Sequence, residues 1–305
     1  MAFDITPYID KKPSEVRELI RQGVIDFPTA GMCRGYAQAN LVILPPEYAD
    51  DFEEYTKKNP FPCPVLEIIR GAPETHAMGE GGNIVTDIPR YRAEILRLKR
   101  QYAGQVEIFL GLEQDIFSSV PEGDWDYRIG SVHCVEKDGD HLSVDGSAAR
   151  FQADAARHYG GDFLAYAADY YRLEAQVVQR TGCQIVGHFD LITKFNEGDC
   201  LFDTGDRHYR AAALEALDVL LETEGIFEIN TGAMSRGYRT APYPAPFLLR
   251  HIHDRRGRIT ITSDSHSRET ILYGYQDAFA LARSCGFECY WVLTADGFRE
   301  VPLPE

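Results

Sequence analysis

Acidic and histidine side chains stand at the ends of several predicted strands, and this arrangement constrains the fold more than any other feature of the chain. Each of these strands is a short apolar run that is rich in β-branched residues. The side chains at their C-terminal tips are Glu113, His133, His188, Asp264 and His266. In a barrel of parallel strands these tips meet on one face, where active sites lie. The sequence therefore predicts a parallel α/β fold that gathers the five side chains on one face.

Carboxylate and imidazole groups together form a ligand set for a borderline divalent ion such as zinc, manganese or iron. A single histidine after a strand is more often a hydrogen-bonded structural residue than a ligand. Four strand ends with the same feature favour the metal interpretation, because clustered carboxylates repel one another and buried imidazoles are costly without a compensating cation. We therefore predict that the five residues bind divalent metal ions, and that Asp264 and His266 also take part in catalysis.

The part of the chain after residue 90 alternates strands with helices of ten or more residues, a pattern typical of βα units and a parallel sheet. The expected strands are 106–113, 127–135, 183–188, 225–231, 258–263 and 288–293, and the expected helices are 90–102, 147–158, 162–181, 207–224, 245–256 and 269–285. These strands are too few for a closed eight-stranded barrel. Residues 1–89 differ in being turn-rich, with short helices expected at 14–22 and 47–58 and apolar runs at 41–44 and 65–69.

Composition narrows the possible partners. The net charge of −16 argues against binding to nucleic acid or to an anionic membrane. No run of 18 apolar residues occurs, and residues 1–10 lack a basic segment followed by an apolar one, so we expect neither a membrane span nor a secretory signal. The seven cysteines form no Cys-x-x-Cys pair, which is typical of reduced thiols in a cytoplasmic protein.

An arginine-containing loop follows the predicted strand 225–231. Arg236 and Arg239 lie in this glycine-containing segment, at the same end of the sheet as the predicted metal ligands. The forked donors of arginine match phosphoryl oxygens, although a surface arginine can equally pair with one of the many carboxylates. We assign phosphate binding to Arg236, with Arg239 and Lys194 as further candidates, so that the expected substrate is a small phosphorylated molecule.

Other histidines are not assigned to the site. His251 and His253 have the spacing of a His-x-His metal pair, but they lie within a predicted helix, where positions two apart point in different directions. Three more histidines lie in polar settings and are expected to be solvated: His141, His158 and His208.

Seven segments of the chain fall in the order found in one enzyme family. They are Gly111–Asp115, Trp125–His133, Ser143–Ser147, Tyr159–Asp162, Gly187–Asn196, Glu228–Ala233 and Ser263–His266. In these segments, residues 90–305 resemble the histidinol-phosphatases of the polymerase-and-histidinol-phosphatase (PHP) superfamily. The resemblance implies a distorted (β/α)7 barrel, a centre of two or three metal ions, and hydrolysis of L-histidinol phosphate in histidine biosynthesis.

The chain departs from this family at its beginning. The family pattern opens with a strand carrying Asp-x-His-x-His and a second carrying Ser-Glu-His, and the chain has neither. Of the remaining ligands, the resemblance implies that Glu113 bridges two ions and that His133 and His188 complete one of those sites. Asp264 would be half of a second site, and His266 a lone ligand of a third. We therefore expect an incomplete barrel, sub-stoichiometric metal and reduced phosphatase activity.

The first 90 residues have a resemblance of their own. Its segments are Ile20–Gly23, Pro28–Gly31, Gly35–Leu41, Asn59–Pro64 and Thr86–Arg92. They resemble the opening third of a hydro-lyase family that is sometimes linked to D-glutamate cyclases. The chain is therefore interpreted as a chimera, with a hydro-lyase-like segment over 1–89 and a histidinol-phosphatase domain over 90–305 that lacks its first two strands.

Three functional hypotheses follow. In the first, the chain is a metal-dependent phosphatase whose N-terminal segment supplies substitute ligands, for which His76, Glu80 and Asp87 are candidates. In the second, it is a non-catalytic remnant that binds phosphate or one metal ion. In the third, a lyase or cyclase acts through the N-terminal segment.

Overall fold

The computed structural model describes residues 76–78, 84–86, 88–118 and 123–304, in two units, Met1–Ala103 and Gly104–Glu305. The elements predicted at 14–22, 41–44, 47–58 and 65–69 lie outside the described residues. In the first unit, strand β1 (His76–Met78) pairs antiparallel with β2 (Ile84–Thr86), and helix α5 (Ile88–Gln101) follows. The helix predicted from residue 90 is confirmed. None of the described helices has the length and apolar character needed to cross a membrane.

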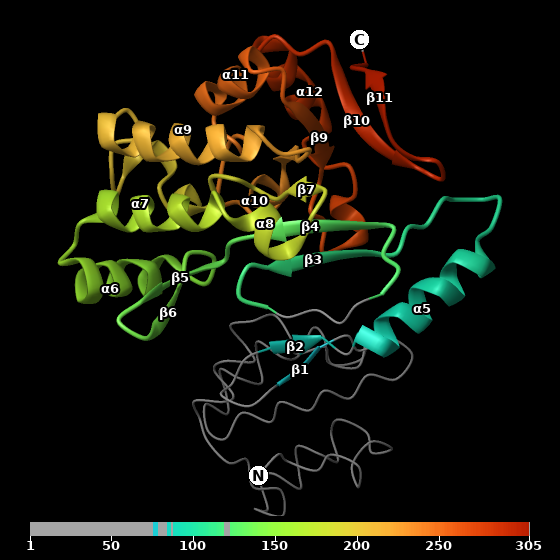
Figure 1. Ribbon diagram of the computed structural model, residues 1–305, viewed down its shortest axis with the longest axis horizontal. Helices are drawn as coiled ribbons and strands as arrows, with labels where there is room; N and C mark the ends of the chain where they lie inside the picture. The colour runs from blue at the N-terminus through green and yellow to red at the C-terminus, as the bar shows by residue number, and fades with distance from the viewer. Residues whose placement is uncertain (1–75, 79–83, 87, 119–122, 305) are drawn as a thin grey trace, which may run out of the picture. The chain divides into compact units, whose positions relative to one another are not determined.

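The second unit is built on a parallel sheet of five strands (Figure 1). In sheet order they are β3 (Gly111–Asp115), β4 (Tyr127–Ser131), β7 (Ile185–Val186), β8 (Ile226–Asn230) and β9 (Arg258–Thr262). In the described part of the chain the first and last of these strands do not pair, so the barrel is open. The prediction of an incomplete (β/α)7 barrel is confirmed.

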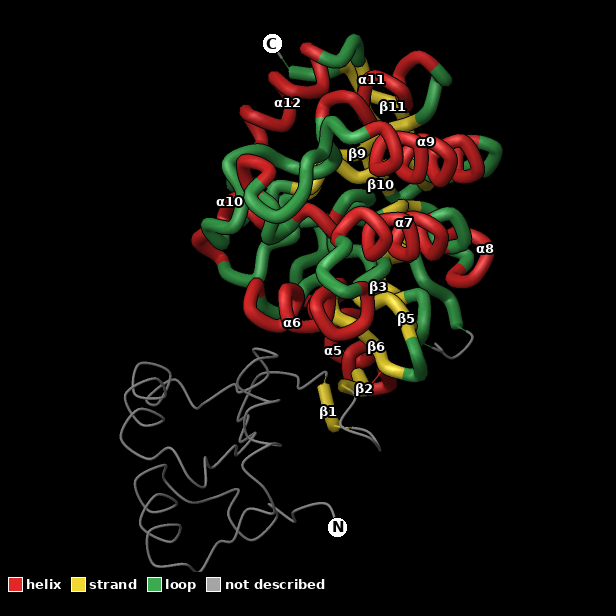
Figure 2. The backbone as a smooth tube through the Cα atoms, turned by 90° about the vertical axis from the view of Figure 1, so that its left-hand side faces the viewer, coloured by secondary structure: helices red, strands yellow, loops and turns green. Residues whose placement is uncertain are grey.

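Helices form an outer layer on this sheet, and α6, α7, α9 and α11 follow one another along one side of it (Figures 1 and 2). The helices are α6 (Ala148–Tyr159), α7 (Phe163–Glu174), α8 (Val177–Thr181), α9 (Arg207–Leu221), α10 (Gly232–Ser235), α11 (Pro246–Asp254) and α12 (Tyr275–Ser284), with 3₁₀ turns at Leu191–Thr193, Glu197–Asp199 and Arg268–Thr270. Side-chain oxygens of Ser147, Asp162 and Asp206 cap the N-termini of α6, α7 and α9, where the first N–H groups have no partner in the helix.

Two expected helices are shorter than predicted. The helix expected over 162–181 is divided into α7 and α8. The helix expected from residue 269 begins only at Tyr275, because Leu272 and Gly274 have φ angles of 66° and 71°, which a right-handed helix cannot contain.

Two hairpins were not predicted. β5 (Cys134–Lys137) and β6 (Asp140–Ser143) are antiparallel, joined by Asp138 and Gly139 with φ angles of 54° and 83°. The strand expected over 127–135 is therefore two strands. The strand expected at 288–293 is present as β10 (Cys289–Thr294), but it pairs with β11 (Gly297–Pro302) in a separate antiparallel sheet and does not extend the parallel one.

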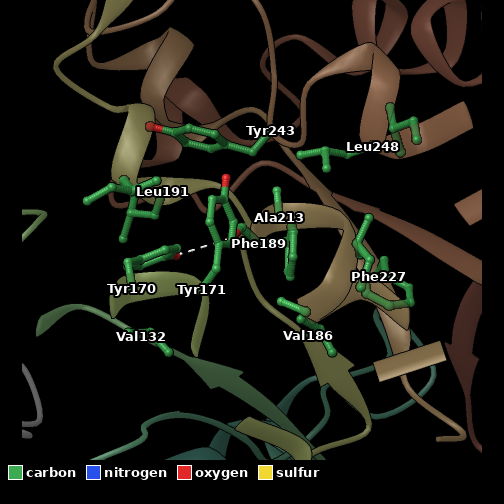
Figure 3. Close-up of a cluster of buried hydrophobic side chains, with 14 of the residues drawn as sticks. Val132, Tyr170, Tyr171, Val186, Phe189, Leu191, Ala213, Phe227, Tyr243 and Leu248 are labelled. Atoms are coloured by element: carbon green, nitrogen blue, oxygen red, sulfur yellow. Dashed lines mark hydrogen bonds between the residues drawn. The ribbon is translucent and has the colours of Figure 1, made fainter. Parts of the chain in front are cut away.

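An aromatic core lies between the sheet and helices α7 and α9 (Figure 3). Tyr170, Tyr171 and Phe189 are at most 1% exposed. The hydroxyls of Tyr171 and Tyr209 are hydrogen-bonded at 2.8 Å, as buried phenols require. Because Phe189 follows His188 directly, this packing holds the chain segment from which that histidine projects.

Candidate metal centre

Three predicted ligands, Glu113, His133 and His188, converge at the C-terminal end of the sheet. Glu113 lies on β3, and the two histidines directly follow β4 and β7. Oε1 of Glu113 lies 3.2 Å from Nε2 of His133 and 3.1 Å from Nε2 of His188. One ligand atom from each of the three residues lies within 4.8 Å of the other two. Parallel pairing brings these strand ends together, since β3, β4 and β7 are consecutive neighbours.

Asp115 orients His133. Its Oδ2 lies 3.1 Å from Nδ1 of His133 and also accepts a hydrogen bond from the backbone N–H of that residue at 3.0 Å. A carboxylate on Nδ1 fixes the tautomer that leaves the Nε2 lone pair free for a metal ion. Because Nε2 is the atom that faces Glu113, the residues present fit a bound divalent ion.

His188 is held differently. It is 5% exposed, and its backbone N–H donates to Oε2 of Glu228 at 2.8 Å. Glu228 is itself buried on β8, where Thr262 and Asn230 also donate to its carboxylate. Burial raises the pKa of Glu228. The carboxylate thus fixes the backbone of His188, whereas Asp115 fixes the ring of His133.

The charges of Glu113, His133 and His188 depend on one another. Burial alone would lower the pKa of His133, but hydrogen bonds with Asp115 and Glu113 hold it well above its ordinary value. Burial also opposes the charged form of His188, yet the Glu113 carboxylate raises its pKa to about 9. Burial acts to raise the pKa of Glu113, and the two histidines outweigh it and hold that pKa well below its usual range. Without metal the two imidazoles hold protons, so a metal ion that binds here displaces protons from imidazole.

Asp264 and His266 form a separate group with Arg236. Nη2 of Arg236 donates to Oδ2 of Asp264 at 2.9 Å, and Nη1 donates to the Asp264 carbonyl oxygen at 3.0 Å. Nη1 also lies 3.1 Å from Nδ1 of His266, whose side chain is 72% exposed. Neither Asp264 nor His266 is among the ligand atoms that converge with Glu113. Their predicted metal and catalytic roles stay predictions.

One carboxylate of each group nevertheless lines the same cavity. Glu113 and Asp264 both line a cavity of about 410 Å³, together with Glu228 and Asn230. A ligand in this cavity can therefore touch Glu113 and Asp264, one carboxylate from each group, whereas His133, His188, Arg236 and His266 are not among the residues that line it.

The other predicted phosphate-binding cations are already paired. Nζ of Lys194 lies 2.5 Å from Oδ1 of Asp145, and the lysine side chain is only 7% exposed. Nε of Arg239 lies 3.1 Å from Oε2 of Glu197. A phosphate at either position would have to share the cation with an acidic side chain.

The remaining histidines divide as follows. His251 and His253 lie on helix α11, as predicted, and His251 pairs with Asp218 at 2.8 Å. His141 and His208 are exposed, as predicted. The prediction is wrong for His158, whose side chain is only 6% exposed, because it packs under the β5–β6 hairpin and pairs with acidic residues there.

The sequence interpretation missed three acidic residues around the site: Asp115, Asp145 and Glu228. A signal existed for Asp115, because a residue two positions beyond Glu113 on a strand points to the same face. Asp145 lies in a loop, and no sequence pattern relates it to Lys194.

Known proteins match the two parts of the chain separately. No family model matches it. Its N-terminal segment of about 86 residues is 51% identical to a "Putative hydro-lyase" of Thermoanaerobacter sp. (strain X514), over 28% of this chain and 32% of that protein. The C-terminal part is 29% identical to a "Probable histidinol-phosphatase" of Schizosaccharomyces pombe, over 64% of this chain and 65% of that one. Both resemblances seen in the sequence are confirmed.

A solved structure also matches. The chain superposes on the crystal structure of a "putative histidinol phosphatase" from Listeria monocytogenes with a TM-score of 0.55 and 19% identity, over 68% of this chain and 84% of that one. This likeness supports the fold. The chain spans about one third of the length of the hydro-lyase relatives that it matches and 65% of the S. pombe protein. It carries two segments similar to two kinds of protein, as the prediction of a chimera requires.

Proposed function

We propose that this chain is a metal-dependent phosphomonoester hydrolase of histidinol-phosphatase type, which converts L-histidinol phosphate to L-histidinol and phosphate. The observation that carries the proposal is the convergence of Glu113, His133 and His188 on ligand atoms within 4.8 Å of one another. The similarity of the C-terminal part to a histidinol-phosphatase gives the substrate. The proposed domains are 1–89 and 90–305, and residues 1–89 are not assigned a catalytic role.

Glu113, His133 and His188 would hold one divalent ion, and Asp115 would keep the His133 ring in its ligating tautomer. A bound ion of this kind lowers the pKa of a coordinated water and neutralises charge on phosphoryl oxygens. Three protein ligands leave a position open for water or substrate. The identity of the ion, whether zinc, manganese or iron, is part of the proposal.

The cationic side chains Arg236, Arg239 and Lys194 would bind the phosphoryl oxygens. Arg236 is placed best for this, since its partner Asp264 lines the same cavity as Glu113. Because each of the three cations is already paired with a carboxylate, we expect the phosphate group to bind weakly. The proposed phosphatase activity is therefore low, which agrees with the lack of the family's opening Asp-x-His-x-His and Ser-Glu-His motifs in the sequence.

The test is phosphate release from L-histidinol phosphate in the presence of added manganese or zinc. We expect slow release by the unaltered chain and a loss of about 100-fold or more in His188→Ala, since a lost metal ligand removes several kcal/mol of charge stabilisation. His208→Ala, which changes an exposed histidine, is the matched control and should retain activity.

Two results would contradict the proposal. Equal release by the unaltered chain and His188→Ala would separate the activity from the proposed centre. No release above the metal-only blank, from a folded chain with metal bound, would favour the non-catalytic remnant, for which the placement of Asp264 and His266 outside the cluster is the supporting observation.

A further inference from the structure

We propose that the Arg236 guanidinium takes the place of a second metal ion at Asp264 and His266, so that this face of the protein binds one divalent ion instead of two. The inference concerns the number of ions, and it rests on the proposed function only in that the first ion binds at Glu113, His133 and His188.

The contacts of Arg236 carry the first step. Its two terminal nitrogens reach the carboxylate and the carbonyl oxygen of Asp264 at 2.9 and 3.0 Å. The same Nη1 lies 3.1 Å from Nδ1 of His266. A guanidinium only donates hydrogen bonds, so it engages lone pairs on Oδ2 and on the carbonyl oxygen of Asp264, which would otherwise be open to a metal ion. His266, the other candidate ligand here, is turned toward the same cation.

Charge gives the second step. The guanidinium is ionised at any pH at which the protein is folded, and it neutralises the single charge of Asp264. A divalent ion at Asp264 would then lie beside a fixed positive charge, next to a carboxylate that is already paired. Like charges at such short separations repel each other strongly, even near a protein surface. The Glu113 cluster is different. In its described contacts Glu113 pairs with the imidazoles of His133 and His188, which can release protons.

The third step is the backbone conformation near Asp264 and Arg236, which favours the contact between these two residues. Asp264 has a φ of 43°, in the left-handed region that costs a non-glycine residue free energy. Gly232 lies against the pair, and a Cβ at this position would come within 2.6 Å of Oδ2 of Asp264 and 2.8 Å of Nη2 of Arg236. Two unusual backbone features thus bring the carboxylate and the guanidinium together.

The test counts bound ions. The metal-free full-length chain, Arg236→Gln, Arg236→Lys and Arg250→Gln are titrated with Zn²⁺ by calorimetry, and metal is measured after dialysis. Arg250 is an exposed arginine on α11, so its change to Gln alters the net charge equally, away from the pair. The count is read as the difference between variants, so that ions bound elsewhere on the chain cancel.

We expect Arg236→Gln to bind one ion more than the unaltered chain, and Arg236→Lys and Arg250→Gln to bind no more. Adding Asp264→Asn to Arg236→Gln should abolish the extra ion. An unchanged count in folded Arg236→Gln would overturn the inference.

Asp264→Asn alone is informative even if the Arg236 variants do not fold. The inference requires that this change leave the ion count of the unaltered chain as it is, and a lower count would show that Asp264 already binds metal. These counts need no substrate. A chain that binds one ion and releases no phosphate would therefore contradict the proposed function and leave this inference standing.

Discussion

The Glu113 cluster and the Arg236 group contain the same kinds of strand-end residue, one carboxylate with imidazole, but they differ in the partner that balances the carboxylate. In the first, two histidines share Oε1 of Glu113 at 3.1 and 3.2 Å. In the second, a guanidinium pairs with Asp264 at 2.9 Å. A metal ion can replace protons on histidine, whereas it cannot discharge an arginine. In the proposed arrangement, the partner of the carboxylate, more than the carboxylate itself, decides whether a strand end binds a metal ion.

Burial separates the histidines of the two groups but not their carboxylates, since the side chain of Glu113 is 41% exposed and that of Asp264 is 21% exposed. His188 is 5% exposed and has a carboxylate fixing its backbone, whereas the His266 side chain is 72% exposed. An ordered buried imidazole loses little freedom when it binds an ion, and an exposed one loses more. His188 is therefore preorganised for binding an ion, and His266 is not.

The preorganisation of the cluster is tested most strongly at Asp115. Asp115→Ala removes the acceptor of the His133 ring, and we expect metal affinity to fall by about 10- to 100-fold, as for other carboxylates behind a histidine ligand. Competition with a chromophoric chelator measures this. Asp277→Ala, at an exposed position on α12, is the control.

Asp115→Asn distinguishes orientation from simple structural support. The amide oxygen can still accept a hydrogen bond from Nδ1, so this variant should recover part of the affinity that Asp115→Ala loses. If Asp115→Ala binds metal as tightly as the unaltered chain, His133 does not depend on its carboxylate partner, and the contrast with His266 fails.

A second prediction concerns how the stability of the protein depends on pH, through a buried carboxyl group that interacts with the cluster histidines. Glu174 on α7 is fully buried, and its Oε1 accepts a hydrogen bond from Tyr170 at 2.6 Å. Burial raises the pKa of Glu174 to about 8, against lowering contributions from Tyr170 and the two cluster histidines. The folded chain therefore keeps a proton that the unfolded chain releases above its ordinary pKa. Stability from this group is present at acid pH and is lost as the pH rises toward 8.

Glu174→Gln should remove this dependence. Between pH 5 and 8 we expect the free energy of unfolding to fall more steeply in the unaltered chain than in the variant, by about 1 kcal/mol per pH unit. Urea unfolding at several pH values measures it, with exposed Glu215→Gln on α9 as the control. Parallel pH profiles for the unaltered chain and Glu174→Gln would show that Glu174 is ionised in the folded protein.

Much of this fold could be predicted because hydrophobic runs and helix periodicity are local. The alternation of strands and helices, and the face that carries the acidic and histidine residues, follow from these patterns. The β5–β6 hairpin was missed although Asp138-Gly139 is a strong turn signal, because the expected strand over β4 was continued into Cys134 and Val135, the first residues of β5. The pairing of β10 with β11 was missed although Asp296-Gly297 is a turn signal of the same kind at the turn between the two strands.

The site was predicted only in part for a related reason. A strand-end position fixes where the backbone of a residue lies, but the side chain follows its local dihedral angles and neighbours. Glu113, His133 and His188 come from consecutive strands and converge. Asp264 follows β9 in a left-handed conformation, and its partner Arg236 follows a different strand, β8. Both residues can be recognised in the sequence, but the contact between them could not be predicted from it.

The smallest effect that we expect comes from Gly232→Ala, which tests the contact of Arg236 with Asp264 without removing either residue. The added methyl group would lie within 2.6 Å of Oδ2 of Asp264, so the carboxylate and the guanidinium must separate. Oδ2 of Asp264 and Nη2 of Arg236 are side-chain ends that can move, but Cβ of Asp264, at 2.9 Å, is fixed to the backbone, so we also expect a modest loss of stability. Zn²⁺ titration should show an extra, weak binding event, fainter than in Arg236→Gln, while Gly146→Ala, whose Cβ meets only the Ser143 side chain, should show none. Gly232→Ala could show no extra binding event while Arg236→Gln binds an extra ion. That result would mean that the charge of Arg236 excludes the second ion from a distance, and that its close contact with Asp264 is not needed.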